Sequence, residues 1–119
     1  MGAADYKYSV TLEYHLNITG GRYTPYDTSI TVVAGLLGIS DETKELHSGC
    51  ISIQDKDTEV GIGQNNNEIY IRISTNNDME AMLRKFFKTT RQRCLVWRGS
   101  DETTIGLAKR IIDEERLTL

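Results

Sequence analysis

One stretch of the chain, residues 84–98, has the composition of an anion-binding surface. It reads RKFFKTTRQRCLVWR and contains no acidic residue. If a helix spans its first part, cations spaced at i, i+1, i+4 and i+7 lie along one stripe. Guanidinium groups hold phosphates and carboxylates through paired hydrogen bonds. The stretch therefore predicts a site for an anionic partner; the alternative is a solvent-exposed helix face that lacks glutamate. The candidate contact residues are the basic side chains of this stretch: Arg84, Lys85, Lys88, Arg91, Arg93 and Arg98.

The same stretch contains Trp97, the one tryptophan of the chain. An exposed indole can stack on a nucleobase or a carbohydrate ring. Tyr70 and Arg72 alternate with isoleucines in a strand-like run, so we assign them to the polar face of the expected sheet and treat them as secondary candidates. The alternative for Trp97 is burial beneath arginine side chains, which is the more usual state of a tryptophan in a short strand.

The charge balance outside this stretch is strongly acidic. The other 104 residues carry 8 basic and 17 acidic groups, a net charge of −9, and the whole chain has a pI of about 5.4. Such a body repels an extended polyanion everywhere beyond the basic stretch. We therefore expect the partner to be a nucleotide-like small molecule, a phosphate-rich ligand or an acidic protein surface, rather than extended nucleic acid.

Residues that commonly perform catalysis are few and scattered. The two histidines, His15 and His47, fall on a predicted polar sheet face and in an acidic loop, and no GxSxG motif occurs. Cys50 and Cys94 are 44 residues apart and form no CxxC pair, which predicts reduced, buried thiols, with a disulfide as the alternative. We expect no enzyme activity and no catalytic residue.

Two short motifs do not qualify as metal or cofactor sites. Residues 55–59 resemble the opening of a calcium loop, but Val60 replaces the glycine that the sixth position requires, and the twelfth position is not a glutamate. Residues 61–66 contain two glycines but neither the helix of a dinucleotide-binding turn nor the lysine of a phosphate-binding loop, so they predict a hairpin. We expect no metal and no cofactor.

The apolar pattern predicts the strands that position these residues. Strict alternation over residues 6–16 predicts a long strand with one buried face. Shorter runs at 50–54, 59–63 and 68–74, separated by turn-rich residues, predict a three-stranded meander. A further short strand is predicted at 94–98, whereas the polar residues 41–48 predict a loop.

Three helices are expected between these strands. Residues 27–38 have apolar side chains at helical spacing and a terminating Gly38. Asn77 and Glu80 predict a capping box at the start of the second helix, and Ser100 or Asp101 caps the third. The second helix, at 79–90, is expected to bury one stripe against the sheet: Met79, Met82, Leu83, Phe86 and Phe87.

The element order β-α-β-β-β-α-β-α predicts an α+β fold. We expect a two-layer sandwich, a mainly antiparallel sheet of about five strands with helices packed on one face. The other face would carry Tyr70 and Arg72 beside the polar residues of the first strand. The β-α-β-β start is similar to that of the RNA-recognition fold, whose sheet stacks bases on aromatic residues. The aromatic motif of that family is absent, so we assign no family.

Length and composition indicate one domain at residues 6–119 after a loose tail at 1–5. No apolar run reaches the roughly 18 residues that span a membrane, and no signal sequence is visible, so we expect a cytoplasmic protein. A long first strand at a sheet edge would offer unpaired backbone groups to a second copy, which favours a homodimer.

These patterns predict a small non-catalytic binding or regulatory domain that recognises an anionic partner through the basic helix-strand stretch. Two other classes remain open. One is a protein-interaction or inhibitor module that acts through its acidic surface or as a homodimer. The other is a small enzyme whose site no motif reveals.

Overall fold

The fold is described by a computed structural model over residues 6–15, 26–39, 45–47, 50–65 and 68–119. The strands are β1 (Tyr8–His15), β2 (Glu45–His47), β3 (Cys50–Gln54), β4 (Thr58–Asn65), β5 (Glu68–Thr75) and β6 (Leu95–Gly99). The helices are α1 (Tyr26–Leu36), α2 (Met79–Thr90) and α3 (Glu102–Glu114). The α+β class, the antiparallel sheet, the three helices and their order are as the sequence predicts. The tail expected at residues 1–5 lies outside the described residues.

The sheet has the strand order β2-β3-β4-β5-β1-β6, and all neighbouring pairs are antiparallel. Its longest ladder joins β1 to β5 over eight residue pairs, from Tyr8 opposite Thr75 to His15 opposite Glu68. The first strand is therefore not an edge strand, and the homodimer argument built on its free backbone groups is wrong. Strand β1 pairs with β5 along its whole length and with β6 over Val10–Glu13, so the homodimer stays a prediction without this argument.

Strand β2 is a second difference from the sequence prediction, which made residues 41–48 a loop. Three of these residues, Glu45–His47, pair with β3, with Leu46 opposite Ile51. A three-residue strand is too short to show a period of two. Its acidic neighbours in the sequence are typical of loops, so only the pairing with β3 reveals it.

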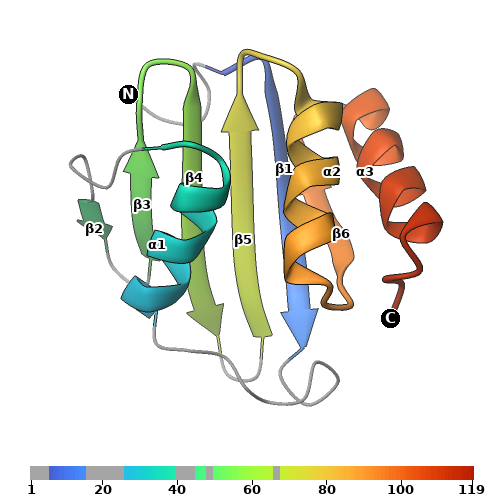
Figure 1. Cartoon of the computed structure of the whole chain (residues 1–119), viewed down its shortest axis with the longest axis horizontal. Coiled ribbons are helices and arrows are strands. Elements are labelled where there is room, and N and C mark those ends of the chain that lie inside the picture. Colours follow the sequence, from blue (N-terminus) through green and yellow to red (C-terminus); the bar gives the residue numbers. More distant parts are fainter. Residues whose placement is uncertain (1–5, 16–25, 40–44, 48–49, 66–67) are drawn as a thin grey trace.

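The sheet has a polar face, which we define by its residues on β1 and β5. The register places Ser9 opposite Ser74, Thr11 opposite Arg72 and Glu13 opposite Tyr70. The intervening apolar pairs, such as Leu12 and Ile71, lie in the buried core. Figure 1 shows α1 in front of β3 and β4, and α2 in front of β1.

Helix ends follow the local sequence with one exception. Gly38 has a left-handed φ of 76°, and the Ile39 N–H donates to the Ala34 oxygen at 2.8 Å, which is the predicted glycine-terminated ending of α1. Helix α2 begins at Asp78, whose carboxylate accepts from the Ala81 N–H at 3.1 Å. The expected capping box is absent because Glu80 lies one position too early to reach back to this cap.

The core joins the sheet to the helices. The α2 residues Phe86 and Phe87 are fully buried and meet edge to face, with ring centroids 5.5 Å apart. Met79 and Leu83 are buried with them, while Met82 is half-buried at the margin. Helix α3 contributes Ala108, Ile111 and Ile112 to the same cluster and contacts β6 and β1. Among the described helices, none is long and apolar enough to cross a membrane.

Phe86→Ala should lower the free energy of unfolding by about 3–5 kcal/mol, because the ring is fully enclosed and its removal leaves a cavity. Urea denaturation followed by circular dichroism measures the change. A loss below about 1 kcal/mol would show that this face of α2 does not pack into the core.

Alanine substitution of two glycines, Gly99 before α3 and Gly106 within it, should change the free energy of unfolding in opposite directions. A Cβ on Gly99 would lie 2.7 Å from Ile105 Cγ1 and 3.1 Å from the Ser9 carbonyl oxygen, so Gly99→Ala should destabilise by about 1–3 kcal/mol. Gly106 has open space around its Cβ position in the middle of the helix, so Gly106→Ala should stabilise by about 1 kcal/mol. The same denaturation measurement on both variants tests the close approach of α3 to β6.

Candidate functional site

The pairing of β6 with β1 contains a bulge that exposes Trp97. Thr11 lies opposite Arg98, but the next residue of β1, Leu12, lies opposite Val96, so Trp97 is an extra residue in β6. Regular alternation would put Trp97 and Arg98 on opposite faces of the sheet. The extra residue brings both side chains to the polar face instead. Bulges that re-aim side chains are frequent beside functional sites.

Trp97 is 48% exposed, so the alternative of a buried indole is wrong. Its ring contacts Tyr70 of β5, with centroids 4.8 Å apart and an interplanar angle of 51°. The Arg98 guanidinium carbon lies over the same indole, 3.9 Å from the ring centroid. Arg98, Trp97 and Tyr70 thus form one contiguous group drawn from two strands that β1 separates.

A hollow of about 440 Å³ lies beside this group on the polar face. Its floor is formed by β4, where Gly61 lies opposite Arg72 and Gly63 opposite Tyr70. Because neither glycine has a side chain, β4 leaves space beside Tyr70 at these positions, whereas Glu59 of the same strand contacts Arg72. The residues that line the hollow come from four strands and the turn after β6: Ser9, Thr11, Gly61, Gly63, Tyr70, Arg72, Trp97, Arg98, Gly99 and Ser100.

The two arginines of the hollow differ in how firmly they are held. Arg72 Nη2 donates to Glu59 Oε1 at 3.0 Å, and the Glu59 side chain is only 7% exposed. This ion pair offsets the charge of Arg72 and fixes its direction. Arg98 forms no ion pair with any residue that the structure describes; its contact is the indole of Trp97. Arg98 is therefore the unbalanced cation of the hollow.

The far end of Tyr70 lies in an acidic environment. Burial raises the pKa of the Tyr70 hydroxyl, and the negative charges of Glu13 and Glu68 raise it further. The hydroxyl is therefore protonated near neutral pH and can donate a hydrogen bond. Glu13 is also in contact with His15 Nε2. The hollow thus has a cationic side at Arg98 and an acidic side at Glu13 and Glu68.

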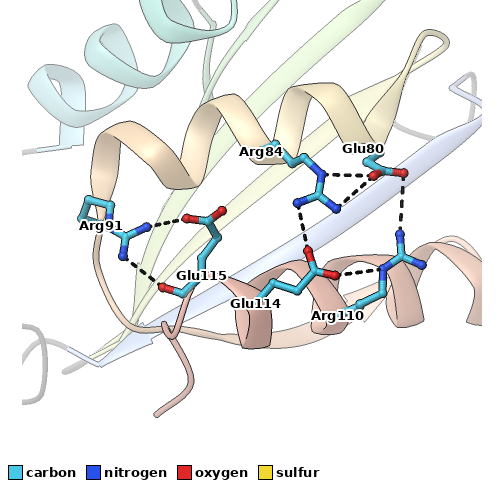
Figure 2. Close-up of polar contacts among 6 residues, drawn as sticks. All are labelled: Glu80, Arg84, Arg91, Arg110, Glu114 and Glu115. Atoms are coloured by element: carbon cyan, nitrogen blue, oxygen red, sulfur yellow. Dashed lines mark hydrogen bonds and ion pairs between the residues drawn. The ribbon is translucent and has the colours of Figure 1, made fainter.

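Two of the four cations in the expected basic stripe, Arg84 and Arg91, are held in ion pairs. Arg84 lies 3.0 Å from both Glu80 and Glu114, and Arg110 of α3 bridges the same two carboxylates at 3.6 and 3.7 Å (Figure 2). Hydrogen bonds to Glu114 and Glu80 raise the pKa of the Arg84 guanidinium, which keeps the pair charged.

Arg91 makes a second, separate contact with the end of α3. It bonds the Glu115 carboxylate at 2.6 Å and the Glu115 backbone oxygen at 3.0 Å (Figure 2). Together with the Arg84 pairs, this contact ties α2 to α3. We refer to Glu80, Arg84, Arg91, Arg110, Glu114 and Glu115 as the interhelix ion-pair network.

Besides Arg98, three of the predicted basic contact residues stay outside this network. Lys85, Lys88 and Arg93 are exposed and make no ion pair within the described part of the chain. Anion binding by the α2 stripe stays a prediction, but it now rests on Lys85 and Lys88 without Arg84 and Arg91. The structure brings together four of the predicted candidates elsewhere, on the polar face: Tyr70, Arg72, Trp97 and Arg98.

The sequence motifs considered for metal binding and the cysteine can be checked against the described residues. No group of three or more His, Cys, Asp or Glu side chains is placed to bind a metal ion in the described ranges. Cys94 is a free, buried thiol, and burial raises its pKa to about 12, so it is not a nucleophile near neutral pH. The calcium-like residues form a tight turn instead, in which Asp55 Oδ1 accepts from the Asp57 and Thr58 N–H groups at 3.0 and 2.9 Å.

Sequence reasoning missed the small residues that shape the hollow. Gly61 and Gly63 were assigned only to a hairpin, which β4 and β5 do form. Their spacing of two was the available signal, because glycines at i and i+2 of one strand leave a gap on one sheet face. Ser100 and Gly99 carry no such signal, since only the bulge in β6 brings them to this site.

Comparison with known proteins gives no assignment. No family model, no curated protein and no solved structure significantly matches the chain. Function is therefore argued from the chemistry of the site.

Charge reversal at Arg91 and at Lys88 distinguishes a residue of the interhelix ion-pair network from an exposed, unpaired cation. Arg91→Glu should destabilise by about 1 kcal/mol, because it removes the bonds to Glu115 and puts two carboxylates together. Lys88→Glu, at an exposed position with no described partner, should change stability by less than about 0.5 kcal/mol. Thermal unfolding measures the stability of both variants. The difference in stability between them should become smaller at about 1 M salt, where the Debye length falls to about 3 Å. Equal stability of the two variants would contradict the network.

Proposed function

We propose that this domain is a non-catalytic binding domain that holds a nucleotide-like anionic small molecule on its polar sheet face. The observation that carries the proposal is the bulge in β6, which presents Trp97 and Arg98 together beside Tyr70 and an adjoining hollow. An exposed aromatic group stacks on a flat ring, and an arginine binds a phosphate through paired hydrogen bonds.

The size of the hollow supports a small ligand. Its volume of about 440 Å³ falls within the roughly 300–1,000 Å³ of small-molecule sites. A long polyanion would have to continue across a body with a net charge of −9 outside residues 84–98, where it is repelled. A mononucleotide needs only one phosphate subsite and one ring platform, which this face offers.

The charge distribution also sets an orientation for the ligand. Arg98 supplies the unbalanced positive charge at one side, and Glu13 and Glu68 supply negative charge near the Tyr70 hydroxyl at the other. A ligand with its anionic group at one end and neutral donors at the other fits this arrangement. A ligand with anionic groups at both ends does not, because one of them would face carboxylates.

Direct titration tests the proposal, because Trp97 is the sole tryptophan and lies at the site. Nucleoside monophosphates are expected to change its fluorescence in a saturable manner, whereas inorganic phosphate alone should do so only weakly. Trp97→Ala, followed by calorimetry, should weaken binding by about 1–3 kcal/mol, the usual contribution of one stacked base.

Two further variants locate the binding surface. Gly63→Val places a side chain on the floor of the hollow and should lower affinity at least about tenfold, or about 1.4 kcal/mol. Its melting temperature is measured alongside, and valine suits a strand position. The matched variant Lys85→Glu/Lys88→Glu changes only exposed α2 cations and should leave affinity unchanged. Retained binding in Gly63→Val with loss in the lysine variant would move the site to α2. If no nucleoside monophosphate binds at millimolar concentration, the proposed function is wrong.

A further inference from the structure

Arg98 occupies the surface on which a ligand ring would stack. Its guanidinium carbon lies 3.9 Å from the Trp97 ring centroid, while Tyr70 already contacts the same indole at a centroid distance of 4.8 Å. A flat ring that stacks on the indole in place of the guanidinium must displace Arg98. Binding therefore replaces the contact between Arg98 and the Trp97 indole by a contact between the ligand ring and the indole.

Arg98 is free to make this exchange, whereas the other arginine of the hollow is not. Arg72 is held at 3.0 Å by the nearly buried carboxylate of Glu59. No described acidic residue holds Arg98 in an ion pair, and its side chain is exposed. Its neighbour on β1 is Thr11, a short side chain that leaves room on this face. The guanidinium can thus turn from the indole toward the hollow.

We propose that Arg98 is the specificity-determining residue of this site: it covers Trp97 until a ligand ring displaces it, and it then binds the ligand's phosphate. This inference rests on the proposed function and names the feature that the site selects, a phosphate group attached to a flat ring. A neutral ring of the same shape can stack on the indole, but it breaks the contact between Arg98 and the indole and offers the guanidinium no new partner. A phosphorylated ring replaces that contact with paired, charge-assisted hydrogen bonds.

The exchange predicts opposite effects of one substitution on two ligands that share a ring. In the unaltered protein, adenosine monophosphate should bind at least about tenfold tighter than adenosine. Arg98→Ala should lower the affinity for the monophosphate about tenfold or more. The affinity for adenosine should stay the same or rise, because no guanidinium then covers the indole. Arg98→Lys should recover only part of the discrimination, since an ammonium group does not form the paired geometry.

Fluorescence titration and calorimetry of both ligands on each variant decide the matter. Arg93→Ala is the matched control, because Arg93 is an exposed arginine of the same stretch that does not line the hollow. Arg93→Ala should keep the same ratio of affinities for adenosine monophosphate and adenosine as the unaltered protein. The Trp97 emission of the ligand-free protein should also shift in Arg98→Ala and stay unchanged in Arg93→Ala, since Arg98 is the arginine that lies over the indole.

The outcomes separate this inference from the proposed function. If Arg98→Ala weakens both ligands equally, or keeps the ratio between them, the inference is wrong while the site itself stands. If neither ligand binds the unaltered protein or Arg98→Ala, the proposed function is wrong and the inference falls with it. Melting temperatures within a few degrees of the unaltered protein establish that each variant is folded.

Discussion

The β1–β5 ladder determines both the core and the candidate site. Its eight antiparallel pairs place Val10, Leu12 and Tyr14 against isoleucines on the buried side. Since side chains alternate along a strand, the same register places Thr11 beside Arg72 and Glu13 beside Tyr70 on the polar face. A slip of one residue would bury the polar set and expose the apolar set. Burial of the apolar residues therefore fixes which polar residues meet, although these contribute little to stability themselves.

Strand β6, which pairs with β1 on the side away from β5, explains why the site has an aromatic group. Strand β6 packs beneath α3, where Gly99 allows Ile105 to approach and Val96 turns toward the core. Both positions face the helices, and between them the bulge accommodates Trp97 and Arg98 on the polar face. The bulge thus reconciles two requirements, close packing of α3 and presentation of two adjacent side chains on one side. A regular strand could meet the first requirement alone, but two adjacent side chains on one face require the bulge.

Much of the fold could be predicted because its signals are local. The alternation in β1 and β5 and the apolar stripe of α2 each repeat over several turns or pairs, so one misleading residue does not obscure them. The site was predicted less well because its signals are not local. Trp97 in the sequence LVWRG looks like an ordinary alternating strand residue, and the bulge appears only in the pairing with β1. Arg84 and Arg91 meet Glu114 and Glu115, which are 30 and 24 residues away in sequence, so the basic stretch looked unpaired.

The ion-pair network changes how the charge asymmetry of the chain is understood. Taken as a linear sequence, residues 84–98 form a positive block on a negative body. In the fold, the acidic end of α3 neutralises the middle of that block, and Arg98 is separated from it at the end of β6. Opposite charges brought together by packing of two helices cannot also attract a distant ligand with full strength, because each charge is already compensated locally. Within the described part of this block, Lys85, Lys88, Arg93 and Arg98 have no carboxylate partner, and Arg98 differs from the other three in lying over an aromatic ring on the polar face.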